Sequence, residues 1–436
     1  MTDVGTLQDQ GVRAVRLLYT DLHGIARGKD IPVSKFERLA EEGVAFCAAV
    51  MSTDLRHTPV VGGEEGYVDF MVRPDVSTLR VLPWQPDVAW CIGDARAADG
   101  SGPAPTCPRG LLERVVARYG VRGLSPVVGP ELEFFLLERD PAASGGLRRY
   151  VDELSRVYTV GPISDPRGIV LDMLYACEAL DLRVFAANHE FMNSQYEINI
   201  EHSGALDAAD RAFLLKTTVK ELAARQGMVA TFMGKPFNDQ GGSGFHLHLS
   251  LADEDGRNAF DGGEELRSQF VAGVLAHGAA LMALLGPTVN AYKRLVPDSL
   301  APTHVNWGVD NRTAFVRVPN ESGSRSRIEI RAGDGSAAPH LAIAGVLLAG
   351  LDGIERRLTP PEPVVGDAYR ADEAHAGSKL PADLGAALDA LEADETLREG
   401  LGAELAETFL AMKRFELDRF NQWVTDWELD EYARHL

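Results

Sequence analysis

Four short segments of the chain carry chemically reactive side chains at every second position. They are residues 131–136, 195–200, 245–251 and 327–331. Side chains alternate between the two faces of a β-strand, so each segment would have one apolar face and one reactive face. The reactive faces consist of Glu131 and Glu133; Gln195, Glu197 and Asn199; His246, His248 and Ser250; and Arg327, Glu329 and Arg331.

This alternation has two interpretations. An antiparallel sheet with one solvated face is its commonest cause. However, lysine, which is frequent on solvated faces, is absent from all four segments, whereas Glu-x-Glu and His-x-His occur. If the strands line one cavity, the gathered negative charge requires cations. Oxygen-rich ligands with a single imidazole suit Mg²⁺ or Mn²⁺ better than Zn²⁺, and several carboxylates can hold two such ions.

Arginines accompany these candidate ligands. They are Arg294, Arg312, Arg317, Arg327 and Arg331. Arginine together with Mg²⁺ is typical of sites that stabilise a transferring phosphoryl group. The chain has no G-x-x-x-x-G-K-[ST] loop and no strand-linked G-x-G-x-x-G, so a bound nucleotide would be held by metals and arginines. A metal-dependent hydrolase on a (β/α)₈ barrel also uses His-x-His, but such sites usually need further histidines, and His277 and His340 lie in helix-like segments.

The elements that would position these residues form two predicted domains, 1–102 and 103–436. The first is β-rich, with a hairpin over 14–19 and 26–31, a helix over 32–39 and strands near 78–82 and 88–92. Residues 97–105 have linker composition, and Pro108 suits the first turn of a helix that runs to residue 119. In the second domain we predict helices near residues 169–180, 208–226, 264–285, 341–357, 382–391 and 405–432.

Composition excludes several classes of function. The 436 residues include 43 Lys+Arg and 64 Asp+Glu, a formal net charge of −21, which argues against a nucleic-acid binder that neutralises phosphates. The four cysteines are far apart, so neither a zinc knuckle nor a disulfide framework is indicated. The first residues lack a signal-peptide pattern, and no apolar run suits a membrane span. We therefore expect a cytoplasmic protein without a membrane partner.

Six ordered motifs, spread over nearly the whole chain, resemble the glutamine synthetase family in its type I-like form. They are GPELEFF (129–135), NHE with QYE (188–197), GSGFHLH (242–248), NAYKRLVP (290–297), NRTAFVRVP (311–319) and RIEIR (327–331). The resemblance implies an α+β fold with a small N-terminal β-grasp domain. It also implies a large catalytic domain whose curved antiparallel sheet or barrel is flanked by helices. A homo-oligomer, a dodecamer of two stacked hexameric rings with sites between subunits, would be expected.

The resemblance also implies roles for individual residues. One divalent ion, Mg²⁺ or Mn²⁺, would be held by Glu133, Glu190 and Glu197, and a second by Glu131, His246 and Glu329. ATP and its phosphates would lie against His248, Ser250, Arg317 and Arg327. The glutamate substrate would be bound by Arg294, Arg331 and the backbone of Gly242, with Arg312 facing the transferred phosphoryl group. ATP would phosphorylate the γ-carboxylate, and an amine would then displace phosphate to form an amide.

Three departures from the family pattern concern the substrates. Leu300 occupies the place of a glutamate that closes the site and helps to deprotonate ammonium, and Cys47 replaces an aspartate that binds ammonium from the adjacent subunit. Gly241 stands where the family has asparagine before Gly-Ser-Gly, so the carboxylate substrate could differ from glutamate. A pocket without those carboxylates attracts NH₄⁺ poorly and suits an apolar or uncharged amine.

We therefore favour a γ-glutamyl–amine ligase, resembling the branch that uses polyamines, ethanolamine or alkylamines. Two alternatives stay open. The chain could be an authentic glutamine synthetase that uses ammonia, or a non-catalytic homologue with a structural or regulatory role. The complete metal-ligand set argues against the non-catalytic homologue, and the missing carboxylates at positions 47 and 300 argue against use of ammonia.

Overall fold

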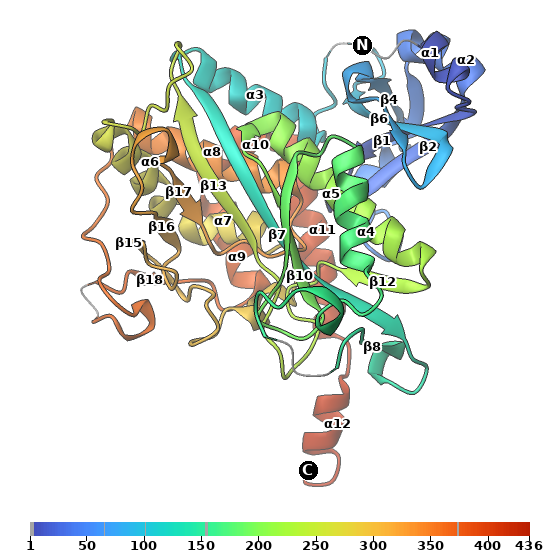
Figure 1. The fold of residues 1–436 in the computed structure, drawn as a ribbon. Helices are drawn as coiled ribbons and strands as arrows, with labels where there is room; N and C mark the ends of the chain where they lie inside the picture. Colours follow the sequence, from blue (N-terminus) through green and yellow to red (C-terminus); the bar gives the residue numbers. More distant parts are fainter. Residues whose placement is uncertain (1–3, 65, 101, 153–155, 373–374) are drawn as a thin grey trace.

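Figure 1 shows the computed structural model, which describes residues 4–436 except 65, 101, 153–155 and 373–374. The fold is α+β, as predicted, with a small N-terminal sheet and a larger sheet covered by helices. The N-terminal strands run in the order β2-β1-β6-β4-β3, with β5 also paired to β6 and with β1 parallel to β6. Their bounds are β1 Ala14–Thr20, β2 Ala26–Pro32, β3 Val44–Cys47, β4 Asp69–Pro74, β5 Arg80–Leu82 and β6 Gln85–Arg96, with helices α1 Val4–Asp9 and α2 Val33–Glu42.

The predicted hairpin is confirmed as the antiparallel pair β1 and β2, and its turn has a structural role. The Asp21 carboxylate accepts the backbone N–H groups of His23 and Ile25, each at 2.9 Å. Gly24 has φ +73°, and a Cβ there would lie 2.8 Å from the Cα of Ala338. Only glycine fits this close approach, which sets the turn against Ala338, the residue before helix α8 (Pro339–Glu355).

The catalytic sheet is built around the long strand β7. The order is β15-β16-β17-β13-β7-β10-β9, and β8, β11 and β12 also pair with β7. The bounds are β7 Ser125–Arg139, β8 Leu147–Arg149, β9 Val184–His189, β10 Gln195–Ile200, β11 Ser203–Gly204, β12 Met228–Thr231, β13 Phe245–Ala252, β15 Trp307–Val309, β16 Val316–Val318 and β17 Ile328–Ile330. A separate two-stranded pair joins β14 His304–Val305 to β18 Ser378–Lys379.

This sheet is mainly antiparallel, as expected, with one parallel pair that makes it mixed. β15 and β16 run parallel, while the other pairs among these described strands are antiparallel. A parallel pair ordinarily needs a long crossover connection. Here each strand is only three residues long. The six residues 310–315 are therefore enough to bring the chain from the end of β15 back to the level where β15 began, so that β16 can run in the same direction.

Helices pack on the apolar side of the catalytic sheet and against one another. They are α3 Pro108–Gly120, α4 Ile169–Ala179, α5 Ala205–Arg225, α6 Glu264–Ala276, α7 Gly278–Leu285, α8 Pro339–Glu355, α9 Leu384–Ala393, α10 Glu395–Leu401 and α11 Ala403–Asn421. The last helix, α12 Asp426–Tyr432, has no buried residue. α8 is buried along nearly all of its length and belongs to the same apolar core as β7 and β13. Pro108 begins α3, as predicted.

Two predicted helices are each divided in the structure. The helix expected over 264–285 breaks at His277 into α6 and α7, which are bent by 75°. The helix expected over 405–432 ends at Asn421, and α12 begins anew with a capping box between Thr425 and Glu428 and extends away from the body (Figure 1). Among the described residues no single helix is long and apolar enough to cross a membrane, although the bent pair α6–α7 meets these criteria when taken together.

Candidate active site

The four segments with reactive faces lie side by side as β17, β13, β7 and β10. The register places Glu133 directly opposite Glu197, and Glu131 directly opposite His246. His248 lies opposite Glu329 on the next strand. Because residues that face each other across neighbouring strands point to the same side of a sheet, the predicted ligands gather on one face.

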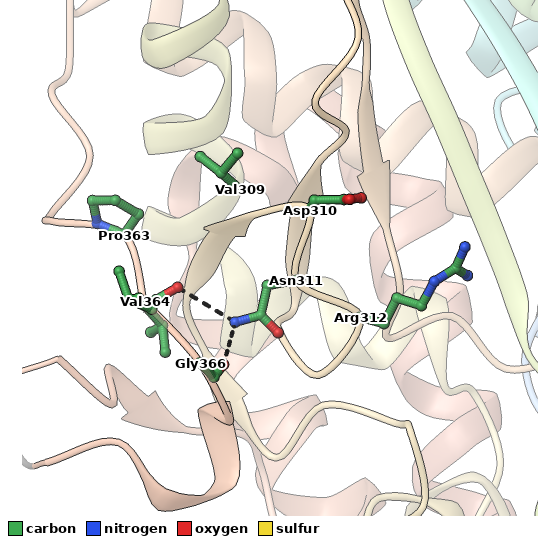
Figure 2. Close-up of a pocket in the computed structure, with 8 residues that line it drawn as sticks. Val309, Asp310, Asn311, Arg312, Pro363, Val364 and Gly366 are labelled. Atoms are coloured by element: carbon green, nitrogen blue, oxygen red, sulfur yellow. Dashed lines mark hydrogen bonds between the residues drawn. The ribbon is translucent and has the colours of Figure 1, made fainter.

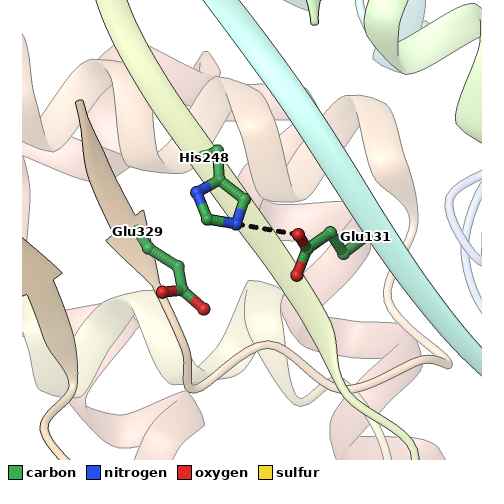
Figure 3. Close-up of side chains that lie close together, drawn as sticks. All are labelled: Glu131, His248 and Glu329. Carbon is green, nitrogen blue, oxygen red and sulfur yellow. Dashed lines mark hydrogen bonds and ion pairs between the residues drawn. The ribbon is translucent and has the colours of Figure 1, made fainter. Parts of the chain in front are cut away.

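Glu131, His248 and Glu329 form the most compact group on this face (Figure 3). One ligand atom from each side chain lies within 4.8 Å of the others, and His248 Nε2 is 3.0 Å from Glu131 Oε1. His246, the imidazole expected in this set, lies close by: its Nδ1 is 3.5 Å from Glu131 and 3.9 Å from Glu329. Burial alone would raise the pKa of Glu131, but hydrogen bonds to both histidines keep that pKa below its ordinary range.

Glu133, Glu190 and Glu197 form a second acidic group beside the first. Glu133 accepts hydrogen bonds from Gln195 Nε2 and from the Gly244 backbone N–H, each at 2.8 Å. Burial, and next the charge of Glu133, raise the pKa of Glu190 to about 7. Burial and the charges of the neighbouring glutamates raise the pKa of Glu197 well above its usual value. A divalent cation would relieve such repulsion. Among the described residues, however, the group whose ligand atoms lie within 4.8 Å of one another is Glu131, His248 and Glu329.

Glu329 connects the metal-ligand group to two arginines. It is completely buried, and Arg317 Nη1 donates to Oε2 at 2.8 Å while Arg331 Nη1 donates to Oε1. Burial alone would raise the pKa of Glu329, but Arg331 and the neighbouring cationic groups bring it to about 2. Glu329 is therefore an ionised carboxylate that orients two guanidiniums and still faces His248.

The three residues expected to bind the carboxylate substrate are close together. Arg294 is buried at the end of the 3₁₀ helix Ala291–Arg294, and its Nη2 donates to the Arg331 carbonyl at 3.2 Å. A Cβ on Gly242 would collide with the Gly234 carbonyl and lie 2.8 Å from Arg294 Cγ. The backbone of the loop at Gly242 therefore packs directly on Arg294, which only a glycine allows.

Three of the four predicted nucleotide residues line one cavity of about 530 Å³. His248, Ser250 and Arg327 lie there together with Glu131, and Arg327 Nε donates to His248 Nδ1 at 3.1 Å. The fourth, Arg317, is not among the residues that line it and is bonded instead to Glu329 and Asp310. The cavity also contains Phe185, His202 and Glu321, which the sequence reasoning missed because none of them lies in an alternating reactive segment.

Arg312 lies apart from this group. It is exposed and borders a separate hollow of about 480 Å³ formed by residues 309–312 and 363–366. In Figure 2 its side chain extends away from Val309 and Pro363. The Arg312 carbonyl accepts a hydrogen bond from Arg331 Nε at 2.9 Å, so the backbone of this loop, rather than the guanidinium, is attached to the site.

The three departures lie in different surroundings. Leu300 lies beside the candidate site, since Arg331 Nη2 donates to its carbonyl at 3.4 Å, and its side chain is 42% exposed. Cys47 ends β3 in the N-terminal sheet and is exposed. At Gly241, a Cβ would lie 3.1–3.4 Å from three atoms of Met192, so that side chain fills the adjacent space.

Comparisons with known proteins identify the family. Residues 105–432 match the family model described as glutamine synthetase, catalytic domain. A glutamine synthetase from Methanocaldococcus jannaschii is 37% identical over 98% of this chain and 96% of its own length. A glutamine synthetase from Thermus thermophilus is 36% identical over 98% of this chain and 97% of its own length.

Solved structures show the same relationship. A GmaS/ADP complex superposes with a TM-score of 0.89 at 33% identity and covers 100% of both chains. A structure described as a novel glutamine synthase homolog has a TM-score of 0.82 at 30% identity, covering 97% of this chain and 98% of its own. The family uses ATP and a divalent metal, and the group of Glu131, His248 and Glu329 on this sheet could hold a metal ion. The chain belongs to the glutamine synthetase family and is an ATP-dependent ligase of that type.

Proposed function

We propose that this chain joins the γ-carboxylate of glutamate, or of a similar carboxylate, to an amine other than ammonia. The observation that carries the proposal is Leu300, whose carbonyl accepts a hydrogen bond from Arg331. The flap, which we define as residues 298–301, has a leucine rather than a carboxylate at position 300, beside Arg331, and its Asp298 pairs with Arg370 instead. An alkylamine or ethanolamine can contact such a surface through its carbon chain.

The phosphorylation step uses the residues that the sheet gathers. We assign Glu131, Glu329 and His246 to one divalent ion, with His248 lying between that ion and the nucleotide cavity. We assign Glu133, Glu190 and Glu197 to the other ion. The ions would neutralise charge that develops on the transferring phosphoryl group. Arg294, Arg331 and Gly242 bind the carboxylate, and ATP lies against His248, Ser250 and Arg327, which line one cavity. Arg317 and Arg312 do not line this cavity, so in this proposal their side chains would turn toward the phosphates when ATP binds.

The acceptor side requires a second subunit in this proposal. Cys47 is exposed on the N-terminal sheet, in the position that the resemblance assigns to the neighbouring subunit's site. We therefore propose a homo-oligomer, a dodecamer of two hexameric rings, in which Cys47 of one subunit completes the acceptor pocket of the next. Replacing an aspartate with cysteine removes a second carboxylate from that pocket.

One alternative is a glutamine synthetase that uses ammonia. It is favoured by the curated relatives at 34–37% identity, which carry that name. The GmaS/ADP complex, at 33% identity, covers 100% of both chains. A protein that is not named glutamine synthetase therefore has the same fold, so the fold alone does not favour ammonia.

An amine panel separates these functions. Phosphate release would be measured with ATP, Mg²⁺ and glutamate against ammonia, methylamine, ethylamine, ethanolamine and putrescine, with the amide product identified by mass. We expect an alkylamine or ethanolamine to give the highest kcat/KM. Ammonia as the best acceptor would show an ordinary glutamine synthetase, and no turnover with any amine would favour the non-catalytic homologue.

The variant Leu300→Glu tests the observation directly. It restores a carboxylate at the flap, so we expect kcat/KM for ammonia to rise about tenfold relative to the preferred amine, as for one added charge-assisted hydrogen bond. Leu300→Gln is the matched control, because it has a similar size and polarity without the charge. Equal acceptor profiles for the two variants would contradict the role of Leu300.

A further inference from the structure

Residues 364–370, here named the clasp, hydrogen-bond to the loop that carries Arg312. Asn311 Nδ2 donates to the carbonyls of Val364 and Gly366 at 3.3 and 2.8 Å (Figure 2). The Ala368 backbone N–H donates to Thr313 Oγ1 at 2.9 Å. Because the Arg312 carbonyl is bonded to Arg331, the clasp is connected to the substrate arginines through this loop.

The clasp also holds the flap that carries Leu300. The Tyr369 hydroxyl donates to the Ala301 carbonyl at 2.9 Å, and burial raises the pKa of Tyr369, so the donor proton is retained at neutral pH. Arg370 also pairs with Asp298 at 3.4 Å, but both side chains are largely exposed and such pairs contribute little. Of these two contacts between clasp and flap, the hydrogen bond from the Tyr369 hydroxyl is the stronger.

The flap needs such a contact because its backbone is strained. Asp298 has φ 62° and Leu300 has φ 59°, the left-handed region that residues other than glycine rarely adopt. A strained backbone persists only where surrounding contacts hold it. Here Ser299 Oγ donates to the Val296 carbonyl at 2.6 Å from one side, and Tyr369 holds the other side.

We propose that Tyr369 is a positioning residue for amine selectivity. Its hydrogen bond to the Ala301 carbonyl keeps the Leu300 carbonyl within hydrogen-bond distance of Arg331. Because the clasp is also bonded to the loop that carries Arg312, a movement of that loop would move Leu300 as well. The inference rests on the proposed function, since it assumes that Leu300 faces the acceptor amine. Tyr369 itself touches no substrate in this proposal and acts through the flap.

Tyr369→Phe removes the hydroxyl and keeps the ring. We expect amide hydrogen exchange at residues 298–301 to become about threefold to tenfold faster, as for the loss of one neutral hydrogen bond. The kcat/KM ratio of the preferred amine to ammonia should fall by a similar factor, while KM for ATP stays unchanged. Tyr175→Phe, at an exposed tyrosine on α4, is the matched control.

The other end of the clasp offers a rescue test. Thr313→Val removes the oxygen that accepts the Ala368 N–H, whereas Thr313→Ser keeps it. We expect the valine variant to speed exchange at the flap, and the serine variant to behave as the parent protein does.

Unchanged flap exchange in Tyr369→Phe would overturn the proposal, and so would faster exchange with an unaltered amine ratio. A parent enzyme that prefers ammonia would refute the proposed function instead. In that case the role of Tyr369 would still be decided by two results for Tyr369→Phe. One is the rate of amide hydrogen exchange at the flap, and the other is the change in the kcat/KM ratio between the two amines relative to the parent protein.

Discussion

At the scale of single residues, Glu329 has the most demanding position in the site. It is buried and ionised, faces His248, and accepts hydrogen bonds from Arg317 and Arg331. A metal ion bound by Glu329 would therefore compete with two guanidiniums for the negative charge of the same carboxylate. This arrangement connects metal binding to the orientation of Arg331, and through Arg331 to the carbonyl of Leu300.

Gly242 allows a prediction at this scale, because its backbone packs on Arg294. In Gly242→Ala the added methyl group would collide with the Gly234 carbonyl and press on Arg294 Cγ. We expect KM for the carboxylate to rise about tenfold or more, with a loss of about 1–3 kcal/mol in stability from overpacking. Steady-state kinetics and thermal denaturation measure the two effects.

Gly241→Ala is the control for this prediction. The three atoms nearest to its methyl group would all belong to the flexible Met192 side chain, which can move aside, so a much smaller change is expected. Equal KM values for the two variants would argue against substrate binding by Arg294 at the Gly242 loop.

At the scale of elements, alternation predicted the four central strands and their shared reactive face, because period two is a strong local signal. The short strands β9, β12, β15 and β16 carry no such pattern and were not predicted. The break at His277 was also missed, since apolar residues flank it on both sides. Its partners Asp352 and Asp394 are 75 and 117 residues away, so no local pattern could reveal them.

His277 gives the prediction at this scale. It lies between α6 and α7, 2.6 Å from Asp394 through Nδ1 and 3.1 Å from Asp352 through Nε2. Both ring nitrogens can donate only when the imidazole is protonated. Burial would lower the pKa of His277, but the hydrogen bonds to Asp394 and Asp352 outweigh it and raise the pKa. Arg356 also pairs with Asp352, at 3.0 Å.

A raised pKa in the folded state stabilises the protein at low pH. The contribution is complete below the unfolded pKa of about 6.5 and is lost as pH rises through the folded pKa. Its size is about 1.4 kcal/mol for each pH unit that separates the folded pKa from the unfolded pKa. Thermal denaturation should therefore show Tm falling above about pH 6.5. His277→Gln should have a flatter profile, and parallel profiles would contradict the assignment.

At the scale of the whole molecule, a buried cation joins the N-terminal sheet to the catalytic helices. Arg109 on α3 donates to Asp210 on α5, and to Asp75 and Asp94 from the N-terminal part. His340 on α8 lies 2.8 Å from Asp210 and extends the network. Sequence alone could not pair these residues, because their separations exceed any local period.

The domain boundary at 102/103 stays a prediction, as do the dodecamer and the cytoplasmic location.

The excess negative charge of the molecule bears on its response to divalent metals. Part of the net −21 lies in the acidic groups of the site, where burial and repulsion raise the pKa of Glu190 and Glu197. Divalent ions that bind only the folded protein stabilise it by linkage, by about 2.7 kcal/mol at a hundredfold excess over Kd. We expect Mg²⁺ or Mn²⁺ to raise Tm and a chelator to reverse the rise.

The variant Glu197→Gln tests the position of the ion. Its metal-free Tm should be unchanged or higher, since a repelled carboxylate is removed, while the rise in Tm on adding metal should be smaller. Glu178→Gln, at an exposed glutamate on α4, should keep the full gain. An equal metal-dependent gain in both variants would place the ion away from Glu197.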